Sequence, residues 1–213
     1  MRVRVYVDGF NLYYRRLRHS RYKWTDLRSL SEKLVAPDDV IERIRYFTAD
    51  VSPRAGDPSA PNRQQAYFRA LKTIPELRIH KGKFLPRQKS RPLVSNPAQK
   101  VLVHDTEEKG SDVNLASHLL MDGFCDQYDV ALVLSQDTDL LEPMRMVVEE
   151  LDKKLIIGWM EQSQPGKKHR YIASAIRHIT QTMLANSQFE DPVIGRGGVK
   201  LARPVEWDPT REM

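Results

Sequence analysis

The stretch V-A-L-V-L-S-Q-D-T-D-L, residues 130–140, joins an uninterrupted apolar run to two aspartates. Five consecutive apolar residues are typical of a parallel strand that is covered by other elements on both faces. In an open parallel sheet, ligands bind beyond the carboxyl ends of the strands. This stretch therefore predicts a central strand of an α/β sheet, with Asp137 and Asp139 at the rim where a ligand would bind.

The amino terminus shows a second strand that ends in a carboxylate. Val3, Val5 and Val7 alternate with Arg4 and Tyr6, and the next residues are Asp8 and Gly9. Alternation with a period of two indicates a β-strand. Because both strands lead into aspartates, we expect Asp8, Asp137 and Asp139 to share one rim of the sheet.

The rest of the chain alternates helical and extended patterns. The expected helices lie near residues 10–17, 25–34, 62–71, 115–123 and 140–151, and the expected strands near residues 40–48, 77–85, 100–104 and 155–159. Asn62 is expected to be a helix N-cap. Loops are expected at 50–61, 86–97 and 107–111, and the basic, proline-containing loop at 86–97 could be mobile. This order predicts a three-layer α/β/α sandwich with a largely parallel sheet.

One domain over residues 1–189 and a separate arm over residues 190–213 are the expected organisation. Glycines and prolines in the arm argue against a compact fold of its own. It nevertheless carries apolar side chains that a solvated linker would not need, namely Val193, Ile194, Val199, Leu201, Val205 and Trp207. We therefore expect the arm to dock onto the domain or onto a second subunit, which makes a homodimer a possible assembly.

Composition limits the class of protein. The chain has 213 residues, of which 40% are hydrophobic and 29% charged, as in ordinary globular proteins. Its net charge of +6 suits a polyanionic partner. The single cysteine, Cys125, excludes an intrachain disulfide and is expected to be a small packing residue.

No apolar run approaches the roughly 20 residues that cross a bilayer, so we expect a cytoplasmic protein with no membrane partner.

A third aspartate joins the rim through helical periodicity. Positions 112, 115, 116, 119 and 120 fall on one helix face, so Asp112 begins an apolar stripe that faces the sheet. Converging carboxylates repel one another unless a cation intervenes, and oxygen donors favour Mg²⁺ or Mn²⁺. The alternative is that Asp112, Asp137 or Asp139 merely caps a helix, which is the commonest role of such an aspartate.

Three motifs in order carry a resemblance to a known family. Y-V-D-G-F-N-L at 6–12, K-G-S-D-V-N-L at 109–115 and V-L-S-Q-D-T-D-L at 133–140 resemble the signature motifs of the NYN domain family, over roughly residues 1–188. The resemblance implies a PIN-like, Rossmann-like fold and a metal-dependent ribonuclease. It implies Asp8, Asp112 and Asp137 as metal ligands and Asp139 as a further acidic member of the site.

Further residues of the motifs receive roles with open alternatives. Asn11 could hold a metal-bound water or a phosphate oxygen, or could cap a helix locally. Ser135 could orient Asp137 or a water, or could simply end its strand. Lys109 could meet a substrate phosphate, although an exposed loop lysine is the simpler interpretation.

Basic side chains near the first motif suggest nucleic-acid binding. Arg15, Arg16 and Arg18 lie among the aromatic residues of segment 13–24, where cations could neutralise phosphates and exposed rings could stack on bases. The alternative places these aromatic rings in the core. A second basic stretch, residues 81–91, could flank a single-stranded path to the acids or could face solvent.

The favoured function is hydrolysis of RNA phosphodiester bonds, with single-stranded RNA as the expected substrate. A phosphatase of the haloacid-dehalogenase kind is disfavoured because Phe10 stands where its second aspartate is required. A P-loop hydrolase is disfavoured because the chain has no G-x-x-x-x-G-K-[ST] motif. The remaining alternative is a non-catalytic RNA-binding or regulatory module that retains a metal site.

Overall fold

A six-stranded parallel sheet forms the centre of the computed structural model, which describes residues 1–210 apart from the side chains of residues 86 and 104–106. The strand order is β3-β2-β1-β6-β7-β8, and every neighbouring pair is parallel. The strands are β1 (Arg2–Asp8), β2 (Val40–Thr48), β3 (Leu77–Lys81), β6 (Val130–Leu134), β7 (Lys154–Trp159) and β8 (Ala175–His178). The predicted parallel α/β sheet is confirmed, with β1 and the apolar β6 as its central pair.

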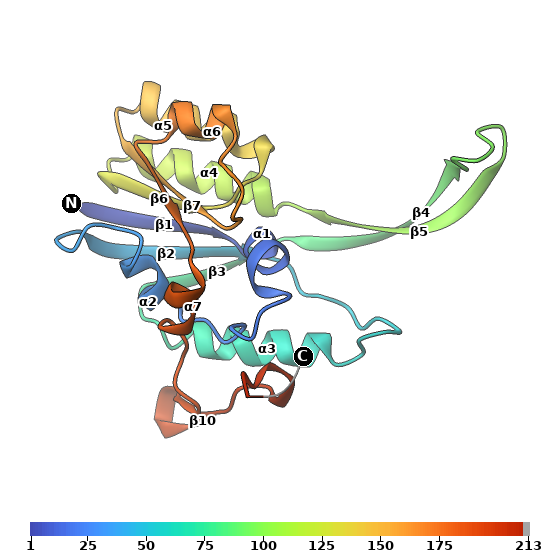
Figure 1. Ribbon diagram of the computed structural model, residues 1–213, viewed down its shortest axis with the longest axis horizontal. Coiled ribbons are helices and arrows are strands. Elements are labelled where there is room, and N and C mark those ends of the chain that lie inside the picture. Colours follow the sequence, from blue (N-terminus) through green and yellow to red (C-terminus); the bar gives the residue numbers. More distant parts are fainter. Residues whose placement is uncertain (211–213) are drawn as a thin grey trace.

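Helices cover both faces of this sheet (Figure 1). One face carries α2 (Leu27–Glu32), α3 (Ala60–Leu71) and α7 (Gln181–Ala185), and the other carries α4 (Ser111–Phe124), α5 (Leu141–Glu149) and α6 (Lys167–Ile172). Val3, Val5 and Val7 belong to a hydrophobic cluster that includes the buried hydrophobic residues of α2 and α3. Tyr6 belongs to a second cluster, which includes the buried hydrophobic residues of α4 and α5. Alternate side chains of β1 are therefore buried in hydrophobic cores on opposite faces of the sheet, as a three-layer sandwich requires.

The segment after β1 begins as an ordinary α-helix and becomes wider at its end. One α-helical turn, α1 (Gly9–Leu12), leads into a π-helix, η1 (Tyr13–Leu17). Leu12 and Leu17 are buried in this segment, whereas Tyr14 is 44% exposed. A π-helical turn brings residues five apart onto one side, which matches the spacing of these two leucines.

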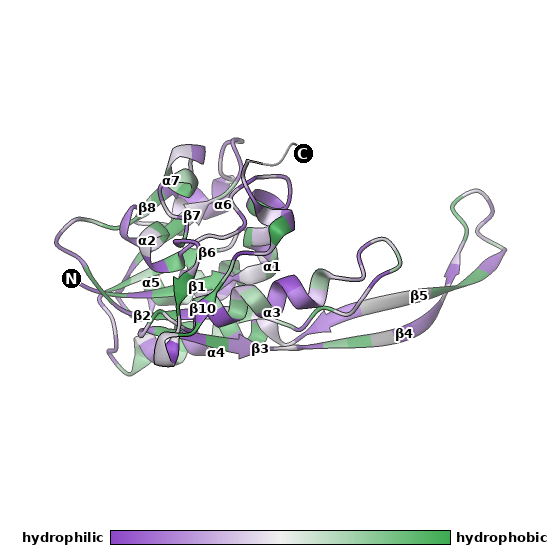
Figure 2. Ribbon diagram, turned by 90° about the horizontal axis from the view of Figure 1, so that it is seen from below, coloured by the Kyte–Doolittle hydropathy of each residue, from purple (hydrophilic) through white to green (hydrophobic). Residues whose placement is uncertain are grey.

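A long antiparallel ribbon projects from the domain (Figures 1 and 2). It consists of β4 (Lys83–Pro92) and β5 (Lys100–Lys109), which pair along their whole lengths. The strand expected at 100–104 is confirmed as the first half of the longer β5. The expected loop at 86–97 is wrong for residues 86–92, and the expected loop at 107–111 is wrong for residues 107–109. Prolines in β4 suggested a loop, but both strands of an isolated ribbon are edge strands, and an edge strand tolerates proline where the missing N–H would face solvent.

Several smaller expectations also change. Helix α3 begins at Ala60 after Ser59, with Pro61 in its first turn, so Asn62 is inside the helix and is not its N-cap. Cys125 is exposed and is not a packing residue. The patterns of α6, β8 and α7 are short and weakly periodic, and the sequence did not indicate these elements.

The carboxyl-terminal arm packs against its own domain. It contains β9 (Val193–Ile194), η3 (Arg196–Gly198), β10 (Lys200–Leu201) and η4 (Val205–Trp207). Val193 is buried, and the ring of Trp207 lies with its centre 6.4 Å from that of Trp24 and 6.0 Å from that of Tyr67. Docking onto the domain is thus confirmed for Val193, Leu201 and Trp207, while Ile194, Val199 and Val205 remain exposed.

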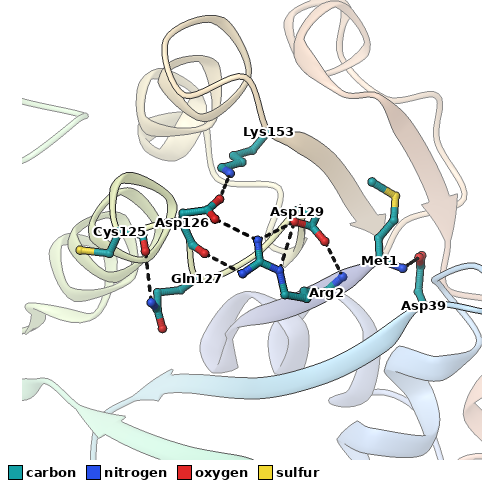
Figure 3. Close-up of polar contacts among 8 residues, drawn as sticks. All are labelled: Met1, Arg2, Asp39, Cys125, Asp126, Gln127, Asp129 and Lys153. Carbon is teal, nitrogen blue, oxygen red and sulfur yellow. Dashed lines mark hydrogen bonds and ion pairs between the residues drawn. The ribbon is translucent and has the colours of Figure 1, made fainter.

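Charged side chains hold together the rim at the amino-terminal ends of the strands (Figure 3). The Arg2 guanidinium donates to Asp129 Oδ1 at 2.7 Å and to the Asp126 carbonyl at 2.8 Å, and the Arg2 backbone N–H donates to Asp129 Oδ2 at 2.8 Å. These bonds join the start of β1 to the loop between α4 and β6.

Within residues 1–210, no helix has the length and apolar character needed to span a bilayer.

Candidate acidic site

The opposite rim brings the three motifs together. Asp8 is the last residue of β1, and Asp137 follows β6, the strand that pairs with β1. Asp112 lies in the first turn of α4, the helix that packs against β1 on one face. Three separate stretches of sequence thus deliver carboxylates to one end of the sheet, where parallel α/β folds bind ligands.

Asp8 is the most enclosed of these acids, with 5% of its surface exposed. Its Oδ1 accepts the backbone N–H of Asn11 at 2.9 Å, and its Oδ2 accepts the hydroxyl of Ser135 at 3.0 Å. Burial raises the pKa of Asp8 to about 6; these two hydrogen bonds oppose the rise, and the charges of Asp112 and Asp137 add to it. Asp8 therefore ionises close to neutral pH instead of well below it.

Ser135 and Asn11 join the first and third motifs. The Ser135 hydroxyl donates to Asp8 and also accepts the Asp137 backbone N–H at 3.2 Å. The Asn11 side-chain oxygen accepts the backbone N–H of Gln136 at 3.1 Å. Ser135 thus orients Asp8 as well as the Asp137 backbone, and the Asn11 amide holds α1 against the loop after β6.

Asp112 is half-buried and feels several negative charges. Its pKa is raised by burial and then by the charges of Asp137, Glu108 and Asp139. It does not cap α4, whose N-cap position is occupied by Gly110 with φ 103°. The capping interpretation is therefore wrong for Asp112, which packs in the first turn on the predicted helix face with Leu115 and Leu119 buried behind it.

The capping interpretation holds for Asp137, and Asp8, for which it was not raised, is also a helix cap. Asp8 caps α1, and Asp137 caps the short 3-10 helix η2 (Thr138–Leu140) by accepting the Asp139 backbone N–H at 3.1 Å. A carboxylate at a helix N-terminus accepts with one oxygen and keeps further lone pairs. Capping and binding a ligand are thus compatible for these residues.

Two residues of this rim were not anticipated. Glu108, at the end of β5, accepts the Ser111 hydroxyl at 2.8 Å and backbone N–H at 3.2 Å, and so binds the start of α4. Gln136 is buried, and its side-chain oxygen accepts the backbone N–H of Met160 at 2.7 Å. Glu108 lies in a segment that was expected to be a loop, and Gln136 lies between Ser135 and Asp137 in the third motif with no charged group to indicate a role.

The donor set suits a hard divalent cation. Oxygen ligands from carboxylates are those that Mg²⁺ and Mn²⁺ prefer. Burial and, to a smaller extent, mutual repulsion raise the pKa of Asp8 and Asp112, and a bound cation would oppose both effects by favouring the ionised carboxylates. Within the described part of the chain, however, no three His, Cys, Asp or Glu side chains are arranged so that they could hold a metal ion as they stand. Side-chain rotation would be needed for Asp8, Asp112 and Asp137 to act as joint ligands.

A family model settles the relationship that this geometry suggests. The NYN domain model matches residues 2–180, which include all three acidic motifs. The chain belongs to the NYN domain family. Its NYN domain therefore spans the whole parallel sheet and the projecting ribbon.

Two individual proteins are similar to this NYN domain. A 6-hydroxy-3-succinoylpyridine 3-monooxygenase, HspA of Pseudomonas putida (strain DSM 28022 / S16), is 31% identical over 183 residues, which cover 73% of this chain and 58% of HspA. The chain thus spans less than two thirds of that relative. The crystal structure of VPA0982, a protein of unknown function from Vibrio parahaemolyticus RIMD 2210633, has the same fold, with a TM-score of 0.58 and 13% identity over 88% of this chain and 96% of that one.

The basic residues around the NYN domain's acidic rim point in different directions. Arg15 forms an ion pair with Glu161, and Arg16 is partly buried with a pKa lowered by that burial. The Arg18 guanidinium lies over the Tyr14 ring, 5.5 Å from its centre. Arg15 and Arg16 line one hollow and Arg18 lines another, so the three arginines do not form a single patch.

At the base of the ribbon, Lys83 and Lys109 lie on the face opposite to that of Glu108. Residues directly opposite each other in an antiparallel pair share a face, so Lys83 and Lys109 share one face and Phe84 and Glu108 share the other. Phe84 contacts Phe10 with ring centres 5.5 Å apart. Lys109 instead pairs with Glu107 at 3.0 Å.

Proposed function

We propose that this NYN domain is a metal-dependent ribonuclease that hydrolyses RNA phosphodiester bonds at the rim formed by Asp8, Asp112 and Asp137, with single-stranded RNA as its preferred substrate. The observation that carries the proposal is that Asp8, Asp112 and Asp137, from three separate motifs, lie at one end of the sheet, with the Asp8 carboxylate enclosed among them. Burial, with a smaller effect of the neighbouring charges of Asp112 and Asp137, raises the pKa of Asp8 to about 6.

Asp8, Asp112 and Asp137 would hold Mg²⁺ or Mn²⁺, with Asp139 and Glu108 adding negative charge around them. When bound, such an ion lowers the pKa of an attacking water and stabilises charge on the transferring phosphoryl group. The Ser135 hydroxyl keeps Asp8 oriented, and Asn11 keeps the end of β1 against the loop after β6. The net charge of +6 favours the approach of a polyanion.

A cleavage assay with three substrates tests this function. Single-stranded RNA, duplex RNA and single-stranded DNA of one sequence are each incubated with the purified chain in Mg²⁺, in Mn²⁺ and in EDTA. We expect cleavage of single-stranded RNA that requires the metal and is faster than cleavage of the other two substrates. Cleavage that persists in EDTA would contradict the metal requirement, and the absence of any cleavage would contradict a catalytic role.

The non-catalytic alternative predicts a different result in the same samples. An RNA-binding module would retain RNA in a gel-shift experiment, with metal-dependent affinity, but would leave the RNA intact after prolonged incubation. Measuring binding and cleavage side by side therefore separates the two functions.

A second candidate function comes from the name of the Pseudomonas putida relative, which describes oxygenation of a substituted pyridine. The observation in its favour is an aromatic-lined cavity of about 410 Å³ that borders Gly9. Incubation of the purified chain with 6-hydroxy-3-succinoylpyridine, air and a reduced nicotinamide cofactor tests it. Formation of a hydroxylated product would favour this function, and full recovery of the pyridine would remove it.

A further inference from the structure

A cavity lies immediately beside the acidic rim on the face of the sheet that carries α3. Its volume is about 410 Å³, within the range of roughly 300–1,000 Å³ typical of small-ligand sites. Its walls come from α1 and η1, from the loop after β2, from α3 and from Trp207 of the arm. Segments far apart in the sequence therefore build one concave space that is open to solvent on one side.

Aromatic rings form much of its wall. They belong to Phe10, Tyr13, Tyr14, Tyr46, Tyr67 and Trp207. The centres of the Tyr46 and Tyr67 rings are 6.4 Å apart, and those of Tyr67 and Trp207 are 6.0 Å apart. Both pairs meet edge to face, with interplanar angles of 85° and 73°, so a flat ligand would stack on the face of one ring, as unpaired nucleobases do, and not between two parallel rings.

The cavity is also positively charged. Arg18, Lys23, Arg54 and Arg63 line it, and Asp57 is the acid among the lining residues. Asp57 is bound to Arg63, with Nη2 and Oδ1 2.6 Å apart, and Glu206 of the arm lies 3.2 Å from Nη1 of the same arginine. Arg63 is thus neutralised, whereas the cavity retains the charge of Arg18, Lys23 and Arg54.

The cavity and the acidic rim share a wall. Gly9, which follows Asp8, lines the cavity, and a Cβ atom added to it would lie 2.6 Å from the Tyr46 hydroxyl. The pKa of Tyr46 is raised by burial and then by the charge of Asp8. A ligand in the cavity would therefore lie next to the strand end that presents Asp8.

We propose that this cavity binds one unstacked nucleotide of the RNA strand, with its base among the tyrosine rings and its phosphate against Arg18 and Lys23. The inference rests on the proposed ribonuclease function, because it makes the cavity a substrate-positioning site beside the cleavage site. Flat aromatic walls favour a base, and the excess of cations favours an attached anion. A nucleotide supplies both.

Calorimetric titration of the wild-type chain in EDTA tests the inference without any cleavage. The probes are UMP and AMP, with uridine as the probe that lacks phosphate and ribose 5-phosphate as the probe that lacks a base. We expect saturable binding of at least one mononucleotide, and binding at least about tenfold weaker for both incomplete probes. Absence of nucleotide binding at millimolar concentration, or equal binding of ribose 5-phosphate, would overturn the inference.

Single substitutions test whether the mononucleotide binds in this cavity. Arg18→Ala and Tyr14→Ala alter exposed side chains that line the cavity, so the fold should be retained, and we expect each to weaken mononucleotide binding about tenfold. Arg69→Ala is the matched control, because Arg69 is exposed on α3 and does not line the cavity. Equal affinities in all three variants would overturn the assignment. Nicotinate, a pyridine with a carboxylate, is the probe for the alternative that the cavity binds a substituted pyridine, and nicotinate binding as tight as that of the nucleotides would also overturn it.

This test can fail separately from the proposed function. Binding without metal-dependent cleavage would leave a nucleotide site in a protein that is not a nuclease. Cleavage with no mononucleotide binding would leave a nuclease and remove the cavity from its substrate path.

Discussion

At the scale of single residues, burial of Asp8 ties stability to pH. Its pKa of about 6 exceeds the ordinary value of 3.8, so the folded protein binds this proton more tightly than the unfolded chain does. The resulting stabilisation is fully present below about pH 4 and is lost as the pH rises through about 6. The difference in pKa corresponds to about 3 kcal/mol at neutral pH in the absence of metal.

Asp8→Asn should therefore raise the melting temperature of the metal-free protein at pH 7.5 and have little effect at pH 4. The asparagine oxygen can still accept the Asn11 N–H, while the ionised group is removed. Calorimetric melting of both proteins in EDTA at the two pH values checks this. A variant that is less stable than wild type at pH 7.5 would show that the Asp8 hydrogen bonds outweigh the cost of its charge.

The same residue should make metal binding depend on pH. A carboxylate must lose its proton to bind a divalent ion, so Mn²⁺ affinity should rise from pH 5 to pH 7 with a midpoint near the Asp8 pKa of about 6. Titrating Mn²⁺ calorimetrically over this range measures it. An affinity that is constant between pH 5 and pH 7 would exclude Asp8 as a ligand.

At the scale of elements, the ribbon carries an acid into the site through the alternation of its faces. Glu108 and Phe84 face the start of α4 and Phe10, whereas Glu107 lies on the other face and pairs with Lys109. The Glu108 charge contributes to the raised pKa of Asp112. A shift of one residue in register would exchange these roles.

Glu108→Gln should keep the bonds to Ser111, because an amide oxygen still accepts, but it should remove a negative charge beside Asp112. We expect the pKa of Asp112 to fall and Mn²⁺ affinity to drop several-fold, since the ion would lose electrostatic attraction. Carboxyl-carbon NMR titration and calorimetry measure the two effects. Glu107→Gln is the control, and equal effects of both substitutions would contradict the placement of the two faces.

The sequence predicted those elements whose burial imposes a clear period. The continuous apolar run of β6 results from burial on both faces of the sheet, and the apolar stripe that follows Asp112 results from packing of α4 against the sheet. The strand β6, the helix α4 and the inward face of α4 could therefore be derived from the residues alone. The ribbon has no core to impose a pattern, and its prolines and lysines resemble those of a loop. Glu108 was missed for that reason, because its role depends on a pairing between distant segments.

At the scale of the whole molecule, the carboxyl-terminal arm supports both the core and the cavity. Val193 enters the hydrophobic cluster, Trp207 packs on Trp24 and Tyr67, and Glu206 pairs with Arg63. The apolar composition of the arm indicated that it would dock. Its position could not be derived from the sequence, because it depends on aromatic residues brought together from three distant segments.

A chain that ends after Phe189 should melt at a lower temperature than the full chain. Loss of the buried Val193 and of the Trp207 contact should cost about 2 kcal/mol, or about 5 °C in a protein of this size. Thermal melting of both chains measures the change, and light scattering shows whether either one dimerises. An unchanged melting temperature would contradict a structural role for the arm.

The central claim, that the acidic rim is a metal-dependent cleavage site, is tested most directly by measuring single-stranded RNA cleavage in Mn²⁺ by Asp112→Asn. Asp112 suits this test because it caps no helix, so asparagine removes a charged oxygen donor without removing a cap. Asp38→Asn is the matched control, because Asp38 is exposed on the loop that precedes β2, at the other end of the sheet. The account predicts that Asp112→Asn remains folded and loses cleavage by about a hundredfold or more, while Asp38→Asn cleaves like wild type. Full activity of folded Asp112→Asn would contradict it.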